Sequence, residues 1–329
     1  MRHHADAHSR RSILAMLAAG PMMSAMPRTS VAAPAKLKEN PMSAIQYRTQ
    51  KVGDVEVFYR EAGPIDAPVL LLLHGFPTSS HMFRDLIPEL ADRYRVIAPD
   101  LPGFGLTKAP PRGQFTYSFD ALAGVIGGFV DAIGLRRYAL YIFDYGAPVG
   151  LRLAMKHPER VTAIITQNGN AYVEGFSKDW EPWQAYWREP TPEHREATRA
   201  SLSDEAIRFQ HEHGAPAGLV SPDGYMLDIL YMHRPGAYEI QLDLILSYRT
   251  NVALYPDFQS YLRTHRPPVL AVWGKHDVFF LPPGAEAFKR DVPDAEIHLL
   301  DAGHFALDTH HREIAADIRD FLGRKLAKQ

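Results

Sequence analysis

Short aliphatic runs, separated by stretches with helical spacing, constrain the fold of this chain more than any other feature. Pro68 to Leu73, Tyr138 to Phe143 and Val269 to Trp273 are continuous apolar runs, a pattern typical of strands buried on both faces. Helical spacing extends over Ser79 to Asp92 and over about Ala147 to Lys156. Strands that alternate with helices predict an α/β fold, a mostly parallel sheet with helices on both faces.

Further segments extend this alternation. Val55 to Arg60 alternates apolar and polar residues, as an antiparallel strand with one exposed face does. We also expect strands and helices over the following ranges: strands Arg95–Ala98, Val161–Thr166 and Glu296–Leu300, and helices Thr116–Ile133 and Arg312–Leu326.

Composition excludes several classes of protein. Of the 329 residues, 46% are hydrophobic and 22% are charged, which is ordinary for a globular protein with a buried core. The net charge is -2 and no block of basic residues occurs, so we expect no nucleic-acid partner. The chain has no cysteine, which excludes disulfides and thiolate metal sites.

The pattern changes over residues 170–261. This segment lacks a buried aliphatic strand and is rich in Trp, Tyr, His and Pro. Its helical segments include Glu193–His213 and Tyr238–Tyr248. We therefore predict a helical cap inserted between two parts of the core, residues 36–169 and 262–329.

Residues 1–35 have the pattern of a targeting segment. Arg10 and Arg11 precede an apolar stretch, Ile13 to Ala19, and Ala33-Pro34-Ala35 offers small residues for cleavage. The stretch is shorter than the about 20 apolar residues that span a bilayer. The sequence thus predicts a twin-arginine-type export signal, a periplasmic location and no stable membrane insertion.

One strand-to-helix turn carries an acid. The run Tyr138 to Phe143 leads directly into Asp144-Tyr145-Gly146 and then into a helix. In a nucleophile elbow, such a turn presents its residue at the carboxyl end of the sheet, and a small residue two places later makes the turn possible. The turn by itself is equally compatible with Asp144 as a helix N-cap.

Polar residues after the other predicted strands favour the catalytic interpretation. Phe76 lies in His74-Gly75-Phe76-Pro77, where a hydrolase of this type places a second oxyanion N–H. Asp277 follows the Val269 strand, and His304 follows the last strand. Nucleophile, acid and base thus occur in the order Asp144, Asp277, His304.

The motifs together resemble the epoxide hydrolase and haloalkane dehalogenase branch of the α/β-hydrolase family. The matching segments are HGFPTSS from His74, DLPGFG from Asp100, DYGAPVG from Asp144, WGKHD from Trp273 and AGHF from Ala302. The resemblance covers nearly all of residues 45–329. It implies the α/β-hydrolase fold, with an inserted helical cap and an aspartate nucleophile.

The residue types then specify a mechanism. A carboxylate that attacks an sp³ carbon forms an alkyl ester, and His304 deprotonates the water that hydrolyses this ester. Asp277 orients the imidazole and stabilises its cationic form. The backbone N–H groups of Phe76 and Tyr145 are expected to hold the oxyanion, an effect of about 3–4 kcal/mol.

The resemblance implies different helper groups for the two chemistries. Dehalogenases of the family hold the halide with a Trp after the nucleophile and often with an Asn before the HGNP proline. This chain has Tyr145 and Phe76 at these positions. Epoxide hydrolases protonate the ring oxygen from two cap tyrosines, and Tyr248 lies in the matching segment, residues 246–251.

The second cap donor remains open at this point. Trp183 stands at the matching position early in the cap, and Tyr186 or Tyr172 could replace the missing tyrosine. Trp183 could equally serve as a halide donor, and any cap aromatic could simply line an apolar pocket.

We therefore expect an enzyme that hydrolyses an epoxide to a diol. The alternatives are hydrolytic dehalogenation, an esterase or lactonase activity and a non-catalytic binding module, which the intact triad argues against. The expected partners are a small apolar or amphipathic organic substrate and water, without a cofactor or metal. The oligomeric state stays open.

Overall fold

A single eight-stranded sheet forms the centre of the molecule. The structure is a computed structural model, and it describes residues 44–326. The strand order is β1-β2-β4-β3-β5-β6-β7-β8. The strands are β1 Gln46–Val52, β2 Val55–Ala62, β3 Val69–Leu73, β4 Arg95–Pro99, β5 Tyr138–Phe143, β6 Val161–Gln167, β7 Val269–Gly274 and β8 Glu296–Leu300.

The sheet is mostly parallel, as predicted. Only β2 runs opposite to the other strands, since it pairs antiparallel with both β1 and β4, whereas β4, β3, β5, β6, β7 and β8 pair in parallel with one another. Strand β1 was not predicted, because its residues are mostly exposed at the sheet edge and form no apolar run.

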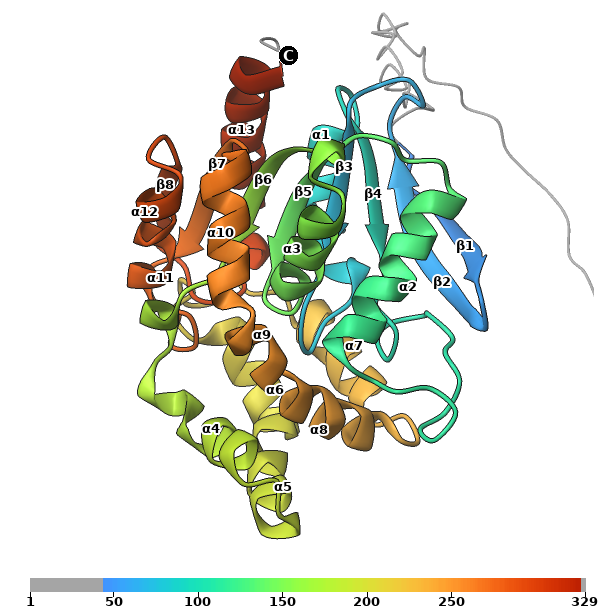
Figure 1. Cartoon of the computed structure of the whole chain (residues 1–329), viewed down its shortest axis with the longest axis vertical. Helices are drawn as coiled ribbons and strands as arrows, with labels where there is room; N and C mark the ends of the chain where they lie inside the picture. The colour runs from blue at the N-terminus through green and yellow to red at the C-terminus, as the bar shows by residue number, and fades with distance from the viewer. Residues whose placement is uncertain (1–43, 327–329) are drawn as a thin grey trace, which may run out of the picture. The chain divides into compact units, whose positions relative to one another are not determined.

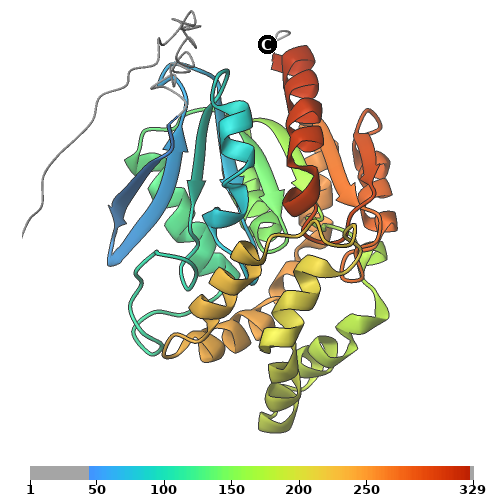
Figure 2. The same cartoon turned by 180° about the vertical axis from the view of Figure 1, so that it is seen from behind.

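Helices cover both faces of the sheet (Figure 1, Figure 2). One core cluster joins α2, α3 and α10 to the residues Leu71 and Leu73 of β3. A second cluster joins α1 and α13 to the alternate residues Leu70 and Leu72. These helices are α1 Leu86–Leu90, α2 Phe119–Ala132, α3 Gly146–Lys156, α10 Tyr255–His265 and α13 Leu307–Leu326. Because successive side chains enter opposite cores, the strand sequence is continuously apolar.

Most of the remaining helices lie between β6 and β7, and they gather beyond one end of the sheet (Figure 1). They are η4 Val173–Gly175, η5 Lys178–Trp180, α4 Glu181–Arg188, α5 Pro192–Thr198, η6 Arg199–Leu202, α6 Asp204–Glu212, α7 Pro222–Met232, α8 Ala237–Ser247 and α9 Arg249–Ala253. Short helices η2 Ser80–Phe83, η3 Pro158–Arg160, α11 Pro282–Glu286 and α12 Phe288–Asp291 complete the fold.

Some predicted helices are shorter than their apolar spacing indicates. The segment Glu193–His213 is divided, because the Ser203 side chain accepts a hydrogen bond from the Ala206 N–H and starts α6 as a separate helix. The segment Ser79–Asp92 likewise forms η2 and α1 rather than one helix. The last helix begins earlier than predicted, at Leu307, and has a kink at His310.

The predicted export signal, residues 1–35, lies outside the described residues. Within residues 44–326, no helix combines the length and apolarity that a membrane crossing requires.

Candidate active site

Asp144 occupies a strained turn between β5 and α3. Its φ angle is 46°, in the left-handed region that non-glycine residues rarely adopt. Gly146 makes this turn possible, because a Cβ at that position would clash with the Leu73 carbonyl oxygen. The N-cap residue of α3 is Tyr145, without a side-chain cap. The turn thus presents the Asp144 carboxylate at the carboxyl end of the central strand.

Backbone N–H groups surround this carboxylate. The Phe76 N–H donates to Asp144 Oδ1 over 2.6 Å, and the Tyr145 N–H also favours the charged form. Asp144 is only 6% exposed. Burial raises the pKa of Asp144 to about 6, against the opposing effects of His304 and these N–H groups. The carboxylate is therefore weakly solvated and ionised at neutral pH.

His304 faces Asp144 from the loop after β8. Its Nε2 lies 3.9 Å from Asp144 Oδ2, and its Nδ1 donates to Asp277 Oδ2 over 2.8 Å. This bond leaves Nε2 free to accept a proton. Burial lowers the pKa of His304, but the charge and hydrogen bond of Asp277 outweigh burial and raise the pKa above its ordinary value.

Asp277 is held by three hydrogen bonds. Besides His304, its Oδ2 accepts from Asn168 Nδ2 over 2.7 Å, and its Oδ1 accepts from the Phe279 N–H over 2.7 Å. Asn168 follows β6 and also accepts from the Gly274 N–H over 3.0 Å, which connects the ends of β6 and β7. The carboxylate is thus fixed in position with both oxygens engaged.

A cavity of about 300 Å³ adjoins Asp144 and His304. Core residues form one part of its wall: Phe76, Asp144, Val278, Phe279 and His304. Cap residues form the other part: Asp179, Trp180, Trp183, Ser201, Ala206, Phe209 and Gln210. A mostly apolar wall with a few polar groups is typical of a site for a small organic molecule.

All four tryptophans already donate their indole N–H to protein acceptors. The two that line the cavity are Trp180, which donates to the Phe279 carbonyl over 2.9 Å, and Trp183, which donates to Ser201 Oγ over 3.1 Å. Trp187 donates to the Ile245 carbonyl and Trp273 to the Phe280 carbonyl. No indole N–H is left for a halide in this arrangement.

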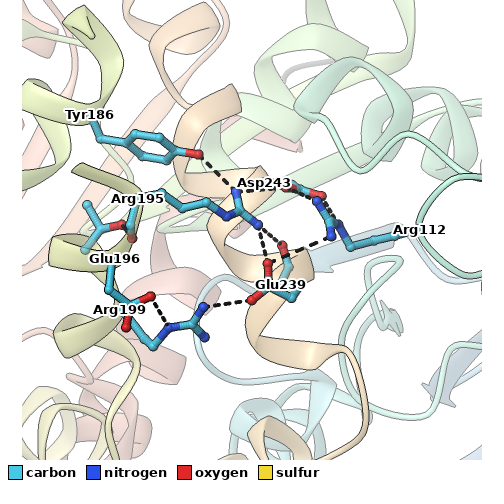
Figure 3. Close-up of polar contacts among 8 residues, drawn as sticks. Arg112, Tyr186, Arg195, Glu196, Arg199, Glu239 and Asp243 are labelled. Carbon is cyan, nitrogen blue, oxygen red and sulfur yellow. Dashed lines mark hydrogen bonds and ion pairs between the residues drawn. The ribbon is translucent and has the colours of Figure 1, made fainter. Parts of the chain in front are cut away.

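The three candidate tyrosines differ in their hydroxyl groups. Tyr172 donates to Asp291 Oδ2 over 2.8 Å. The Tyr186 hydroxyl accepts from Arg195 Nη1 over 2.9 Å, at the edge of an ion-pair cluster that joins cap residues to Arg112 of the core (Figure 3). The cluster consists of Arg112, Arg195, Arg199, Glu196, Glu239 and Asp243. Tyr186 is therefore bound to the cap's own charges and does not line the cavity.

Tyr248 is fully buried, and its hydroxyl has no aligned hydrogen-bond partner among the described residues. Its ring packs against Trp180, with 5.1 Å between centroids, and against Tyr145, at 5.8 Å. Burial raises the pKa of Tyr248 well above 10, and the nearby Tyr255 phenol and Asp144 carboxylate raise it further. The phenol is thus protonated and close enough to Asp144 to feel its charge. Tyr248 is not among the residues that line the cavity.

The fold brings the predicted residues Phe76, Asp144 and His304 together, with Asp277 behind the histidine and Trp183 across the cavity. Sequence reasoning did not select several other residues of the site: Asn168, Trp180, Gln210, Tyr255 and Phe279. Trp180 lies within the aromatic stretch early in the cap, which was a usable signal. A glutamine in a polar helix offers no such signal.

A buried ionic cluster connects the cap to the core beside this site. His211 of α6 bonds Asp228 Oδ2 of α7 over 3.1 Å and Asp308 Oδ2 of α13 over 2.7 Å. Its ring stacks on Phe305, the neighbour of His304, with 3.7 Å between centroids. Although burial alone would lower the pKa of His211, the two aspartates raise it to about 9. Within residues 44–326, no group of three or more potential ligands is arranged to hold a metal ion.

Comparison with known proteins assigns the family. Residues 68–311 match the model of the alpha/beta hydrolase fold family, so the chain belongs to the α/β-hydrolases. It is 47% identical over 277 residues to an uncharacterized hydrolase of Saccharomyces cerevisiae, covering 83% of this chain and 95% of the relative.

The chain is also similar in sequence to a haloalkane dehalogenase, and in fold to an epoxide hydrolase. It is 31% identical over 261 residues to haloalkane dehalogenase 2 of Mycobacterium tuberculosis, covering 78% of this chain and 88% of that protein. The solved structure of epoxide hydrolase CorEH shares the fold with a TM-score of 0.71 at 19% identity, covering 85% and 99% of the two chains. The protein is thus an enzyme of the hydrolase type.

Proposed function

We propose that Asp144 is a nucleophile and that the enzyme hydrolyses epoxides to vicinal diols. A carboxylate oxygen of Asp144 bonds to an epoxide carbon while the carbon–oxygen bond of the ring breaks. The ring oxygen takes its proton from Tyr248, because an alkoxide is too basic to leave unprotonated. The products of this half-reaction are an alkyl ester on Asp144 and a Tyr248 phenolate.

Water then hydrolyses the ester. His304 Nε2 takes a proton from the water as its oxygen attacks the ester carbonyl. The tetrahedral oxyanion is stabilised by the N–H groups of Phe76 and Tyr145, which already surround the carboxylate in the resting enzyme. His304 returns this proton to the departing diol. The second proton of the water is left on the Asp144 carboxyl group, and its transfer to the Tyr248 phenolate restores both groups.

One observation carries the choice of epoxides. The Tyr248 hydroxyl is buried and has no well-aligned hydrogen bond, with the Tyr255 phenol as its polar neighbour, whereas the indole N–H groups are all engaged. Leaving a buried hydroxyl without a well-aligned hydrogen bond costs about 1–3 kcal/mol, so a donor kept in this condition beside a reactive carboxylate supports a function. Epoxide opening needs such an O–H donor, and halide departure instead needs free N–H donors.

Hydrolytic dehalogenation is the second candidate, because haloalkane dehalogenase 2 of Mycobacterium tuberculosis is 31% identical over most of its length. This reaction would use the same Asp144 ester and the same His304 step. It would require Trp183 to exchange its bond with Ser201 for one with the halide.

A paired assay separates these candidates. Wild type, Tyr248→Phe and Trp183→Phe are each supplied with 1,2-epoxyhexane and with 1-bromohexane, and diol and bromide are measured. We expect diol formation that Tyr248→Phe suppresses and little bromide. Strong bromide release that Trp183→Phe abolishes, with the epoxide untouched, would instead assign the enzyme to dehalogenation.

A further inference from the structure

The cavity wall has one buried polar side chain, apart from Asp144 and His304, that forms no hydrogen bond with any residue of 44–326. This side chain is Gln210. Its side chain is only 7% exposed, and no described residue bonds its amide. Ser201, the other neutral polar residue of the wall, donates to the Thr198 carbonyl and accepts from Trp183. A primary amide has two donors and an acceptor, and those of Gln210 reach the cavity, so its position in the wall points to a ligand.

The helix that carries Gln210 presents a consistent face to the cavity. Ala206, Phe209 and Gln210 of α6 all line the wall, and positions three and four apart lie on the same side of a helix. The next residue, His211, turns away and bonds Asp228 and Asp308. This buried cluster fixes the rotation of α6 against the core, and it holds Gln210 at the cavity.

The charges of the cavity wall restrict which substrate groups can bind near Gln210. Two carboxylates, Asp144 and Asp179, line the cavity, and no Lys or Arg of the described chain does so. A carboxylate on the substrate, as in a haloacid, would find no Lys or Arg there and would be repelled by these two carboxylates. A neutral amide, by contrast, matches a neutral hydroxyl, carbonyl or amide group.

We propose that Gln210 is a specificity-determining residue that binds a second, neutral polar group of the substrate. Building on the proposed function, the substrate class is a neutral epoxide that bears a hydroxyl, carbonyl or amide group away from the ring. Trp180, Phe279 and the other apolar residues of the wall surround the hydrocarbon part between these two groups.

The test uses inert ligands, so that it does not depend on turnover. Calorimetry gives the Kd of octane-1,2-diol and of octanetriols whose third hydroxyl stands at carbons 5 to 8, for wild type and Gln210→Leu. The quantity compared is the ratio of diol Kd to triol Kd. For the best-placed triol we expect this ratio to fall about three- to tenfold in Gln210→Leu, the loss of one neutral hydrogen bond.

Two further variants control for packing. Gln210→Met keeps the length and volume of the side chain and should lower the ratio in the same way. Phe209→Leu changes the same wall without removing a polar group, so both ligands should be affected alike and the ratio should persist. A ratio that is equal in folded Gln210→Leu, Gln210→Met and wild type for every triol overturns the proposal.

The matching epoxides, 1,2-epoxyoctane and its hydroxylated analogues, distinguish this proposal from the function on which it builds. A wild type that hydrolyses both epoxides, with selectivity independent of Gln210, rejects the role of Gln210 alone. A wild type that consumes neither epoxide, yet shows Gln210-dependent discrimination among the inert ligands, rejects epoxide hydrolysis and retains the recognition role.

Discussion

The Asn168 amide donates to Asp277 Oδ2 over 2.7 Å, so the carboxylate that holds His304 is itself held from the neighbouring strand end. His304 Nδ1 shares the same oxygen over 2.8 Å. Substitution of Asp277 by Asn would remove the charge that stabilises the imidazolium and would disturb the tautomer of the ring. We expect Asp277→Asn to lower kcat by on the order of 10⁴-fold while the fold persists.

Steady-state turnover, with circular dichroism to verify folding, measures this loss. Asp301→Asn is the matched control, because Asp301 is an exposed carboxylate that pairs with Lys275 and His276 beside Asp277. It should retain near wild-type turnover. Asn168→Ala should have an intermediate effect of about tenfold, since it removes one hydrogen bond to a charged group. Near wild-type rates in folded Asp277→Asn would mean that another acid serves His304.

Tyr248→Phe should slow the two half-reactions to different extents. We expect ester formation to slow by about 10²- to 10⁴-fold, because the phenol supplies the proton only in that step, and ester hydrolysis to change much less. Stability should change little, because the hydroxyl has no well-aligned hydrogen bond to lose. Rapid-quench measurement of both steps gives the comparison.

Tyr186→Phe is the control for this experiment. Its hydroxyl bonds Arg195 in the cap rather than the site, so ester formation should continue at close to the wild-type rate. Equal slowing of both steps in Tyr248→Phe, or greater slowing in Tyr186→Phe, would argue that Tyr248 is not the proton donor.

The His211 cluster predicts a pH-dependent stability. The pKa of His211 is raised to about 9 in the folded protein, against about 6.5 in an unfolded chain. The protonated form thus stabilises the fold fully below about pH 6.5, and this contribution is lost as the pH rises through about 9. The facing groups are Asp228, Asp308, Arg84, which pairs with Asp308, and His304.

Urea unfolding at pH 6, 7, 8 and 9 tests this dependence. His211→Gln should lose about 3–5 kcal/mol at pH 6, because two buried carboxylates lose their bond to the imidazolium, and its stability should vary less between pH 6.5 and 9. His233→Gln provides the control, since His233 pairs with Asp204 at the exposed surface and should have an effect below about 1 kcal/mol. Parallel pH profiles for wild type and His211→Gln would refute the role of the cluster.

Residues 1–35 lead us to propose export, from the Arg10-Arg11 pair and the Ala33-Pro34-Ala35 site. In a bacterial host with a twin-arginine pathway, the full chain should appear in the periplasm with a new N-terminus close to Lys36. The double substitution Arg10→Lys and Arg11→Lys should keep the protein in the cytoplasm. Arg2→Lys, which lies outside the pair, should not prevent export. Cytoplasmic protein that still starts at Met1 would exclude export.

The core of this fold was predictable because each of its buried strands has a continuously apolar sequence. Asp144 and Asp277 could be selected because they follow two such strands, β5 and β7, and His304 because it follows the last strand, β8. The roles of cap residues depend on tertiary contacts instead. The phenol of Tyr186 is engaged because Arg195, nine residues away in sequence, bonds it, and no spacing rule reveals this.

Gln210 and Asn168 also could not be selected from the sequence. Their amides have no distinctive sequence context, and only the packing of α6 on the core and of β6 beside β7 gives them neighbours. Edge strand β1 was missed because its pattern is polar, and its existence depends on pairing with β2.

The central claim is that Asp144 forms a covalent ester, and one variant tests it directly. His304→Gln should still be alkylated but should not hydrolyse the ester, so mass spectrometry after incubation with 1,2-epoxyhexane should find one substrate mass on the peptide that contains Asp144. Adduct formation should decline as the pH falls through about 6, since the carboxylate is then protonated. The midpoint should lie no lower than this, because the variant lacks the His304 charge that favours the ionised form. Asp144→Asn in the same background should form no adduct. A folded His304→Gln variant that never carries an adduct, with a substrate that the wild type hydrolyses, would contradict the account.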